Sequence, residues 1–125
     1  MQLQLKYNLP FVQIQIEHNN KILLIPAVLI DTGSASTLFS IDFLLNIGIQ
    51  PDPFDKIHTI RGVGGTEVVF RKKIQAIRFE NFTISNFDVE VGSMDYGFEI
   101  NGILGMDFLL AAGVKIDLQN LQLFI

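Results

Sequence analysis

The sequence predicts an all-β domain, because short apolar segments recur along the chain with turn signals between them. Residues 12–17 alternate apolar and polar side chains, as a half-buried strand does. Residues 22–30 form a nearly continuous apolar run, which is typical of a strand buried on both faces. Many short strands separated by closely spaced turns are typical of a β barrel or a β sandwich.

The first predicted hairpin joins these two strands through the polar turn at residues 18–21. It delivers Asp31 to the end of the buried strand. A short helix is predicted over residues 40–48, because Ser40 is a good N-cap, Asp42 suits the first turn and Gly48 can end the helix. Pro51 and Pro53 then interrupt the chain before the next strand.

The second half of the chain continues the same pattern of strands and turns. Predicted strands cover residues 57–61, 67–70, 73–79 and 82–91, with a tight turn at residues 80–81. A second short helix is predicted from about Asp107 to Ala112, with Gly113 as its stop, followed by a hairpin of residues 114–118 and 121–125. Because no repeat or linker interrupts the pattern, we expect one domain over residues 1–125.

Composition excludes several classes of function. The chain has 125 residues, 49% of them hydrophobic, and no cysteine, so disulfides, thiolate catalysis and cysteine-bound zinc are excluded. A net charge of -4 argues against nucleic acid as a partner, and the one basic run, residues 71–73, is predicted to be a solvated strand end. With no signal-peptide pattern and no apolar stretch of about 20 residues, we expect a soluble cytoplasmic protein without a membrane partner.

The segment Asp31-Thr32-Gly33-Ser34 carries the strongest chemical signal. It places a carboxylate directly after a buried strand, where an unpaired charge is costly unless it is hydrogen-bonded or shares a proton. Gly33 permits a tight turn, and two hydroxyls lie beside the acid. A structural alternative is that Asp31 simply caps a turn through an Asx-type hydrogen bond.

A glycine-rich segment, Gly62-Val63-Gly64-Gly65-Thr66, lies between two predicted strands. It could cradle a phosphate or form the tip of a hairpin. A phosphate loop needs a Gly-Lys-Ser/Thr ending or a following helix, whereas a β-branched run follows here. The hairpin is therefore the favoured interpretation.

Three motifs in this order resemble the single-domain, retropepsin-like aspartic proteases: the Asp31 tetrad, the glycine-rich hairpin, and Ile103-Leu104-Gly105 before a short helix. The resemblance covers nearly the whole chain. It implies a closed acid-protease β barrel of six to seven strands, with a flap hairpin over a cleft and one or two short helices.

The same resemblance implies roles for individual residues. Asp31 would be the catalytic acid, Thr32 would lock two active-site loops together, and Gly33 would let the loop approach a substrate. Gly62, Val63, Gly64, Gly65 and Thr66 would form the flap, while Ile103, Leu104 and Gly105 would form the second active-site strand. Ser34 replaces the alanine that is common in the viral members.

The implied chemistry needs two carboxyl groups, one as general base and one protonated to polarise the scissile carbonyl. The chain contains one such tetrad. Asp107 and Asp117 lack the Thr-Gly continuation and are interpreted as a helix-start charge and a solvent-facing strand residue. The expected solution is a two-fold homodimer in which each copy supplies its Asp31.

Ser34 leads to a finer expectation. Its hydroxyl is predicted to donate to the outer oxygen of Asp31, which would favour the charged carboxylate. An acidic activity optimum should follow, with an alkaline limb that moves upward in Ser34→Ala.

The leading hypothesis is a homodimeric aspartic endopeptidase that binds an extended peptide and cleaves it with activated water. A non-catalytic dimerisation or peptide-binding module of the same fold is the alternative, and a β-barrel binder of small ligands is a weaker one. We expect no cofactor and no metal, since His18 and His58 are isolated from other metal-binding residues. Phe70 or Phe98 is expected to line a substrate pocket.

Overall fold

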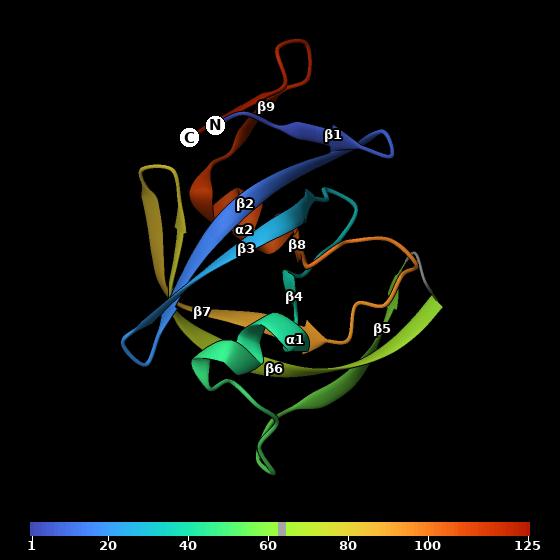
Figure 1. Ribbon diagram of the computed structural model, residues 1–125, viewed down its shortest axis with the longest axis vertical. Coiled ribbons are helices and arrows are strands. Elements are labelled where there is room, and N and C mark those ends of the chain that lie inside the picture. The colour runs from blue at the N-terminus through green and yellow to red at the C-terminus, as the bar shows by residue number, and fades with distance from the viewer. Residues whose placement is uncertain (63–64) are drawn as a thin grey trace.

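The computed structural model describes residues 1–62 and 65–125, and it is mainly β with short helices (Figure 1). The strands are β1 (Gln4–Lys6), β2 (Leu9–His18), β3 (Lys21–Ile30), β4 (Leu38–Ser40), β5 (Ile57–Gly62), β6 (Gly65–Phe79), β7 (Phe82–Gly92), β8 (Gly102–Leu104), β9 (Lys115–Asp117) and β10 (Gln122–Phe124). The helices are α1 (Ile41–Leu44), the 3₁₀ turn η1 (Leu45–Ile47) and α2 (Met106–Ala112). The predicted all-β class with two short helices is confirmed.

Eight of these strands form one sheet in the order β1-β2-β3-β8-β4-β7-β6-β5. Strand β2 also pairs with β6, through Ile16 opposite Ile77 and its neighbours on either side. This extra pairing joins β2, β3, β8, β4, β7 and β6 into a ring of hydrogen-bonded strands.

The first hairpin forms as predicted. Asn19 and Asn20 form its turn, and both have positive φ, 51° and 62°, as a two-residue turn of this hand requires. The last four residues of β3, residues 27–30, are all buried. They alternate between two apolar clusters, one inside the ring and one on its other face, which explains the continuous apolar run in the sequence.

A bulge in β3 positions the segment that lies beside Asp31. The register with β2 shifts between Val12 opposite Val28 and Ile14 opposite Ile25, and Ala27 has a φ of 55°. The Pro26 and Ala27 carbonyls point to Asn101 and accept hydrogen bonds from its side chain (2.9 Å) and its backbone N–H (3.0 Å). The bulge thus anchors the start of β8.

Both predicted helices form, with the predicted caps. Ser40 accepts a hydrogen bond from the Asp42 N–H, but α1 is a single turn that continues as η1 and ends at Gly48, whose φ is 80°. Helix α2 ends at Gly113 with a φ of 66°. No helix in the described part of the chain is both long enough and apolar enough to cross a membrane.

The basic run at residues 71–73 is not a strand end, as the sequence had suggested. It lies in the middle of β6, which is continuous from Gly65 to Phe79. Each cation meets a carboxylate: Arg71 pairs with Glu90 (3.1 Å), Lys72 with Asp55 (2.9 Å) and Lys73 with Asp88 (3.0 Å). Acidic partners on neighbouring segments let the charged residues sit inside a long strand.

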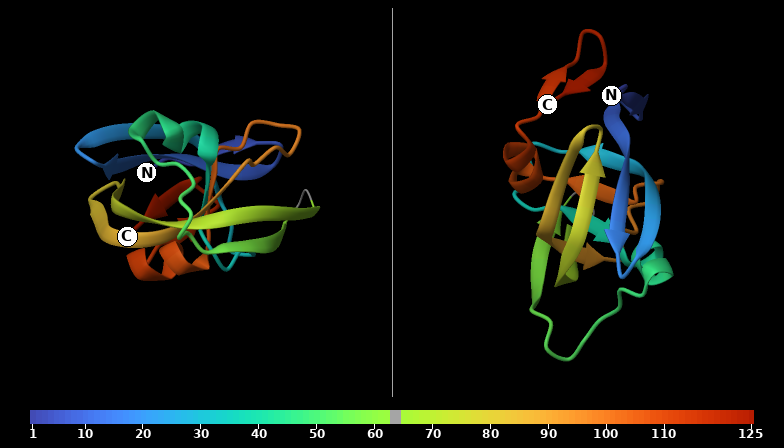
Figure 2. Two further views of the ribbon diagram at one scale, coloured as in Figure 1. Left: turned by 90° about the horizontal axis from the view of Figure 1, so that it is seen from below. Right: turned by 90° about the vertical axis from the view of Figure 1, so that its left-hand side faces the viewer.

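The two ends of the chain lie together at one end of the molecule, where β9 and β10 form the predicted terminal hairpin (Figure 2). The N-terminal segment runs beside this hairpin. The Leu3 N–H donates to the Leu121 carbonyl (2.7 Å), and the Leu123 N–H donates to the Met1 carbonyl (2.8 Å).

Candidate active site

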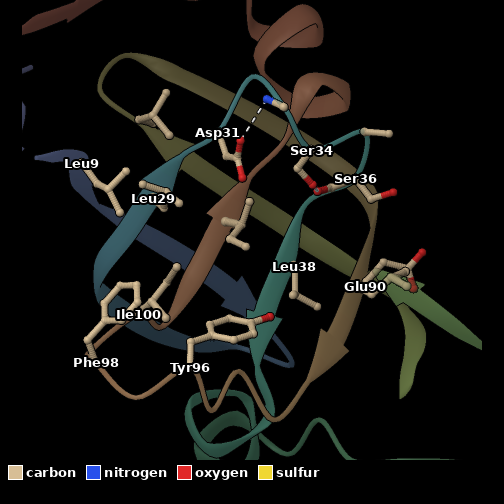
Figure 3. Close-up of a pocket in the computed structure, with 15 residues that line it drawn as sticks. Leu9, Leu29, Asp31, Ser34, Ser36, Leu38, Glu90, Tyr96, Phe98 and Ile100 are labelled. Carbon is tan, nitrogen blue, oxygen red and sulfur yellow. Dashed lines mark hydrogen bonds between the residues drawn. The ribbon is translucent and has the colours of Figure 1, made fainter. Parts of the chain in front are cut away.

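The loop that follows β3 presents Asp31 at the surface. The Asp31 N–H donates to the Leu104 carbonyl of β8 at 3.0 Å. The Gly33 N–H donates to Asp31 Oδ1 at 2.9 Å (Figure 3). Asp31 therefore does cap a turn through an Asx-type hydrogen bond. That bond uses only Oδ1 of the carboxylate and leaves Oδ2 outside the turn. Asp31 itself is partly exposed.

Strand β8 lies directly beside this loop, as the family resemblance implies for Ile103 and Leu104. It pairs in parallel with β3, with Ile30 opposite Leu104 and Leu29 opposite Ile103. Gly105 follows at a point of very close approach, since a Cβ there would lie 2.3 Å from the Ser36 carbonyl oxygen. Only glycine fits between the two segments without moving the backbone.

Thr37 and Asp107 tie the Asp31 loop to helix α2, a contact that the sequence analysis missed. Thr37 donates from its hydroxyl to Asp107 Oδ1 (2.8 Å) and from its N–H to Asp107 Oδ2 (3.2 Å). The fully buried Thr37 hydroxyl also accepts the Gly105 N–H at 3.2 Å. Asp107 does lie in the first turn of α2, as predicted, but it also fixes the loop.

Ser34 does not donate to Asp31, so that expectation is wrong. Its hydroxyl donates to the Ser36 carbonyl at 2.8 Å and closes the loop on itself. The Ser34 carbonyl is in turn held by the Met106 N–H at 2.7 Å. Ser34 therefore supports the shape of the loop. Thr32 and Gly33 are exposed, and the loop-locking role of Thr32 stays a prediction.

A cavity of about 580 Å³ opens beside Asp31. Its wall is largely apolar, with Asp31 and two serines at one side (Figure 3). The residues that line it are Leu9, Leu29, Ile30, Asp31, Gly33, Ser34, Ala35, Ser36, Leu38, Ile60, Glu90, Tyr96, Phe98, Ile100 and Ile103. An apolar cavity with a few convergent polar groups is the usual form of a binding site.

The predicted flap corresponds to the end of the β5–β6 hairpin. The last described pair is Gly62 opposite Gly65, and Thr66 pairs with Arg61. Val63 and Gly64 lie outside the described residues. Ile60 of β5 lines the cavity, so the hairpin that carries the predicted flap borders the site.

Phe98 lines the cavity, whereas Phe70 packs against the core inside the ring. Of the two aromatic candidates, Phe98 is therefore the one at the cavity, and its contact with a substrate stays a prediction. It belongs to the connection between β7 and β8, residues 93–101, which we call the wall loop. Tyr96 and Ile100 of the wall loop also line the cavity.

Glu90 is an acidic residue of the site that the sequence analysis missed. Its side chain is 4% exposed, and Oε1 meets His58 Nε2 at 3.0 Å and Arg71 at 3.1 Å. Within the described part of the chain, Oε2 has no hydrogen-bond partner. Glu90 pairs with Leu38 in the sheet and so faces the cavity side, although alternation alone suggests a solvent-facing residue.

The sequence matches the aspartyl protease family over residues 14–108, which include the Asp31 loop, the flap hairpin and β8. The chain belongs to the aspartyl protease family. A search of curated proteins finds no match.

Aspartyl protease chemistry uses two adjacent carboxyl groups. Among the described residues, Asp31 and Glu90 are the acids that line the cavity. Glu90 is paired with Arg71 and His58, not with Asp31. Asp107 is fully engaged with Thr37 and Phe108, and Asp117 is hydrogen-bonded to Asn120 in the terminal hairpin. Among the described residues, Asp31 is thus the cavity acid that has no cationic partner.

Proposed function

We propose that the protein is a retropepsin-like aspartic endopeptidase in which Asp31 from each of two identical chains forms the catalytic dyad. The observation that carries the proposal is the setting of Asp31. It follows a buried strand, lies at the mouth of an apolar cavity, and keeps one carboxylate oxygen outside the turn hydrogen bond. The ring of strands agrees with the barrel that such proteases have.

The proposed reaction uses water as the nucleophile. One Asp31 carboxylate takes a proton from the water while the other, protonated Asp31 donates a hydrogen bond to the scissile carbonyl. Two adjacent carboxyls share one proton because ionising both is unfavourable. The exposed loop residues Thr32 and Gly33 leave room for a second copy to approach.

The substrate is proposed to be an extended peptide that lies under the flap hairpin. A strand-like peptide can satisfy its backbone groups by pairing with the site. The apolar wall made by Leu29, Ile60, Phe98 and Ile100 favours a large apolar side chain near the scissile bond.

Cleavage of a mixed peptide library tests the activity. Wild-type protein should produce new peptide termini, and Asp31→Asn should produce none. Asp88→Asn is the matched control, because Asp88 is an exposed acid that pairs with Lys73 far from the loop in sequence. Binding without cleavage by the wild type would select the non-catalytic module instead.

Subunit mixing tests the dyad across two chains. If each site needs both copies of Asp31, adding an excess of Asp31→Asn chains should suppress the activity of a fixed amount of wild-type chains. Adding Asp88→Asn chains should not. Activity that stays proportional to the wild-type chains, or a 14.0 kDa monomer in sedimentation at the pH of full activity, would contradict the dimeric site.

A further inference from the structure

Glu67 lies on the flap hairpin, two residues after the first residue of β6, and reaches the wall loop. We propose that Glu67 is a positioning residue that links the flap hairpin to the wall loop, so that flap position sets the shape of the substrate pocket. This inference rests on the proposed protease function. The three wall-loop residues that line the cavity, Tyr96, Phe98 and Ile100, would then move with the flap.

Three donors from the wall loop converge on the Glu67 carboxylate. The Met94 N–H donates to Oε1 at 2.9 Å, and the Ser93 hydroxyl donates to the same oxygen at 3.4 Å. The Tyr96 hydroxyl donates to Oε2 at 2.5 Å. Hydrogen bonds to a charged acceptor are short and strong, so this carboxylate is an effective anchor.

The neighbouring strand is shaped to receive the carboxylate. A Cβ at Gly92 of β7 would lie 2.6 Å from Glu67 Oε1 and 3.0 Å from Val69 Cγ1. The absence of a side chain at Gly92 therefore creates the space that Glu67 fills. The Glu67 carboxylate thus occupies a defined space beside Gly92 and accepts three hydrogen bonds, so its position is fixed by its surroundings.

Asn101, at the end of the wall loop, is anchored by the backbones of Pro26, Ala27 and Ser40, but the rest of the loop has few polar anchors besides Glu67. Among the described residues, no backbone hydrogen bond joins residues 93–100 to another segment's backbone. Met94 has a φ of 53°, a strained value for this residue type, and its N–H donates to Glu67. Phe98 packs against the Tyr7 ring at 5.1 Å, and Glu99 lies 3.9 Å from Lys6 on the surface. The polar contacts of the first half of the loop thus come mainly from Glu67, while Asn101 fixes its other end.

Tyrosine ionisation reports the link directly. Burial raises the pKa of Tyr96 well above its ordinary value, and the hydrogen bond and negative charge of Glu67 raise it further. The chain has two tyrosines and no tryptophan, so ultraviolet absorbance of tyrosinate is easily assigned. Between the ordinary and the raised pKa, unfolded Tyr96 ionises first, so this contribution to stability is lost as the pH rises.

The first test is an alkaline absorbance titration of the wild type, Tyr7→Phe and Glu67→Gln, with circular dichroism at each pH to confirm folding. In Tyr7→Phe the remaining tyrosine should stay protonated until the fold is lost. Glu67→Gln removes the negative charge beside Tyr96, so Tyr96 should ionise at a lower pH in this variant than in the wild type. An ordinary titration of Tyr96 in the folded Tyr7→Phe protein would overturn the link.

The second test compares peptides that carry a large or a small apolar side chain beside the scissile bond. Tyr96→Phe keeps the ring but removes the donor, and it should lower the kcat/KM preference for the large side chain by about tenfold. The change should arise in KM more than in kcat, since Asp31 is untouched. Glu99→Gln, on the same loop but outside the cavity lining, is the control.

An unchanged peptide preference in Tyr96→Phe and Glu67→Gln would overturn the positioning role, even if stability falls. If the wild type cleaves nothing, the proposed function has failed, but the same comparison can be made as peptide binding. Binding preference that moves with Glu67→Gln supports the link without catalysis, and binding preference that does not move overturns it.

Discussion

Asp31 and Asp107 follow the two strands of one parallel pair, Asp31 in the loop after β3 and Asp107 in the first turn of α2 after β8, yet their surroundings differ. Asp107 accepts hydrogen bonds from the Thr37 N–H, the Thr37 hydroxyl and the Phe108 N–H. Among the described residues, the Asp31 side chain accepts one, from the Gly33 N–H. The saturated carboxylate holds the loops together, and the unsaturated one is available for chemistry.

The difference follows from the sequence around each acid. Asp107 can reach Thr37 because Gly105 brings α2 close to the Asp31 loop, where the Thr37 hydroxyl is fully buried. Asp31 and Asp107 are both partly buried, so exposure does not separate them. They differ in the donors within reach, which are two from Thr37 and one from Phe108 at Asp107, and the Gly33 N–H at Asp31.

Asp31→Asn should give the largest effect on function and almost none on folding. Asparagine keeps the shape and can still accept the Gly33 N–H, but it cannot act as a general base. We expect peptide cleavage to fall by about 10⁴-fold or more, while the free energy of unfolding changes by less than about 0.5 kcal/mol. Cleavage assays and urea denaturation check both values. A large loss of stability would mean that Asp31 is structural, like Asp107.

Gly105→Ala should give the largest effect on folding. Its Cβ would meet the Ser36 carbonyl carbon at 2.6 Å and oxygen at 2.3 Å, and backbone atoms cannot turn away as a flexible side chain can. We expect a loss of about 3 kcal/mol in unfolding free energy, together with lost activity because the Asp31 loop must move. Urea denaturation measures this loss. A stable and active variant would show that the close approach of the two segments is not needed.

Asp107→Asn sharpens the comparison from the structural side. The amide that replaces Oδ2 would face the Thr37 N–H, so two donors would meet in a partly buried place. We expect a loss of about 2 kcal/mol in unfolding free energy. Asp42→Asn is the matched control, since Asp42 also lies in the first turn of a helix but serves the α1 N-terminus. It should lose no more than about 0.5 kcal/mol. Equal losses of unfolding free energy in the two variants would show that Asp107 acts only as a charge at the start of a helix.

Local features of the fold could be predicted from the sequence because local chemistry determines them. The apolar run of β3, the Asn19-Asn20 turn and the caps Ser40 and Gly113 each act within a few residues. The Asp31 tetrad could be singled out for the same reason. The position of β8 beside it followed from the family resemblance.

Contacts between distant segments could not be predicted in this way. Glu90 follows an alternating pattern that suggests solvent, but its partners Arg71 and His58 come from two other strands. Glu67 finds its donors in a loop 26 to 29 residues further along the chain. The direction of the Ser34 hydroxyl also depended on a tertiary detail, the position of the Ser36 carbonyl.

Ser34→Ala should give the smallest effect and tests whether the Asp31 loop and the Asp31 charge are separate. The lost hydrogen bond to the Ser36 carbonyl should lower the unfolding free energy by about 1 kcal/mol. Because the hydroxyl does not contact Asp31, the alkaline limb of the kcat/KM profile should stay in place. An alkaline limb that moves to higher pH would show that the Ser34 hydroxyl turns toward Asp31 when two chains assemble. The contrast between Asp107, which accepts three hydrogen bonds, and Asp31, which accepts one, would then hold for the single chain alone.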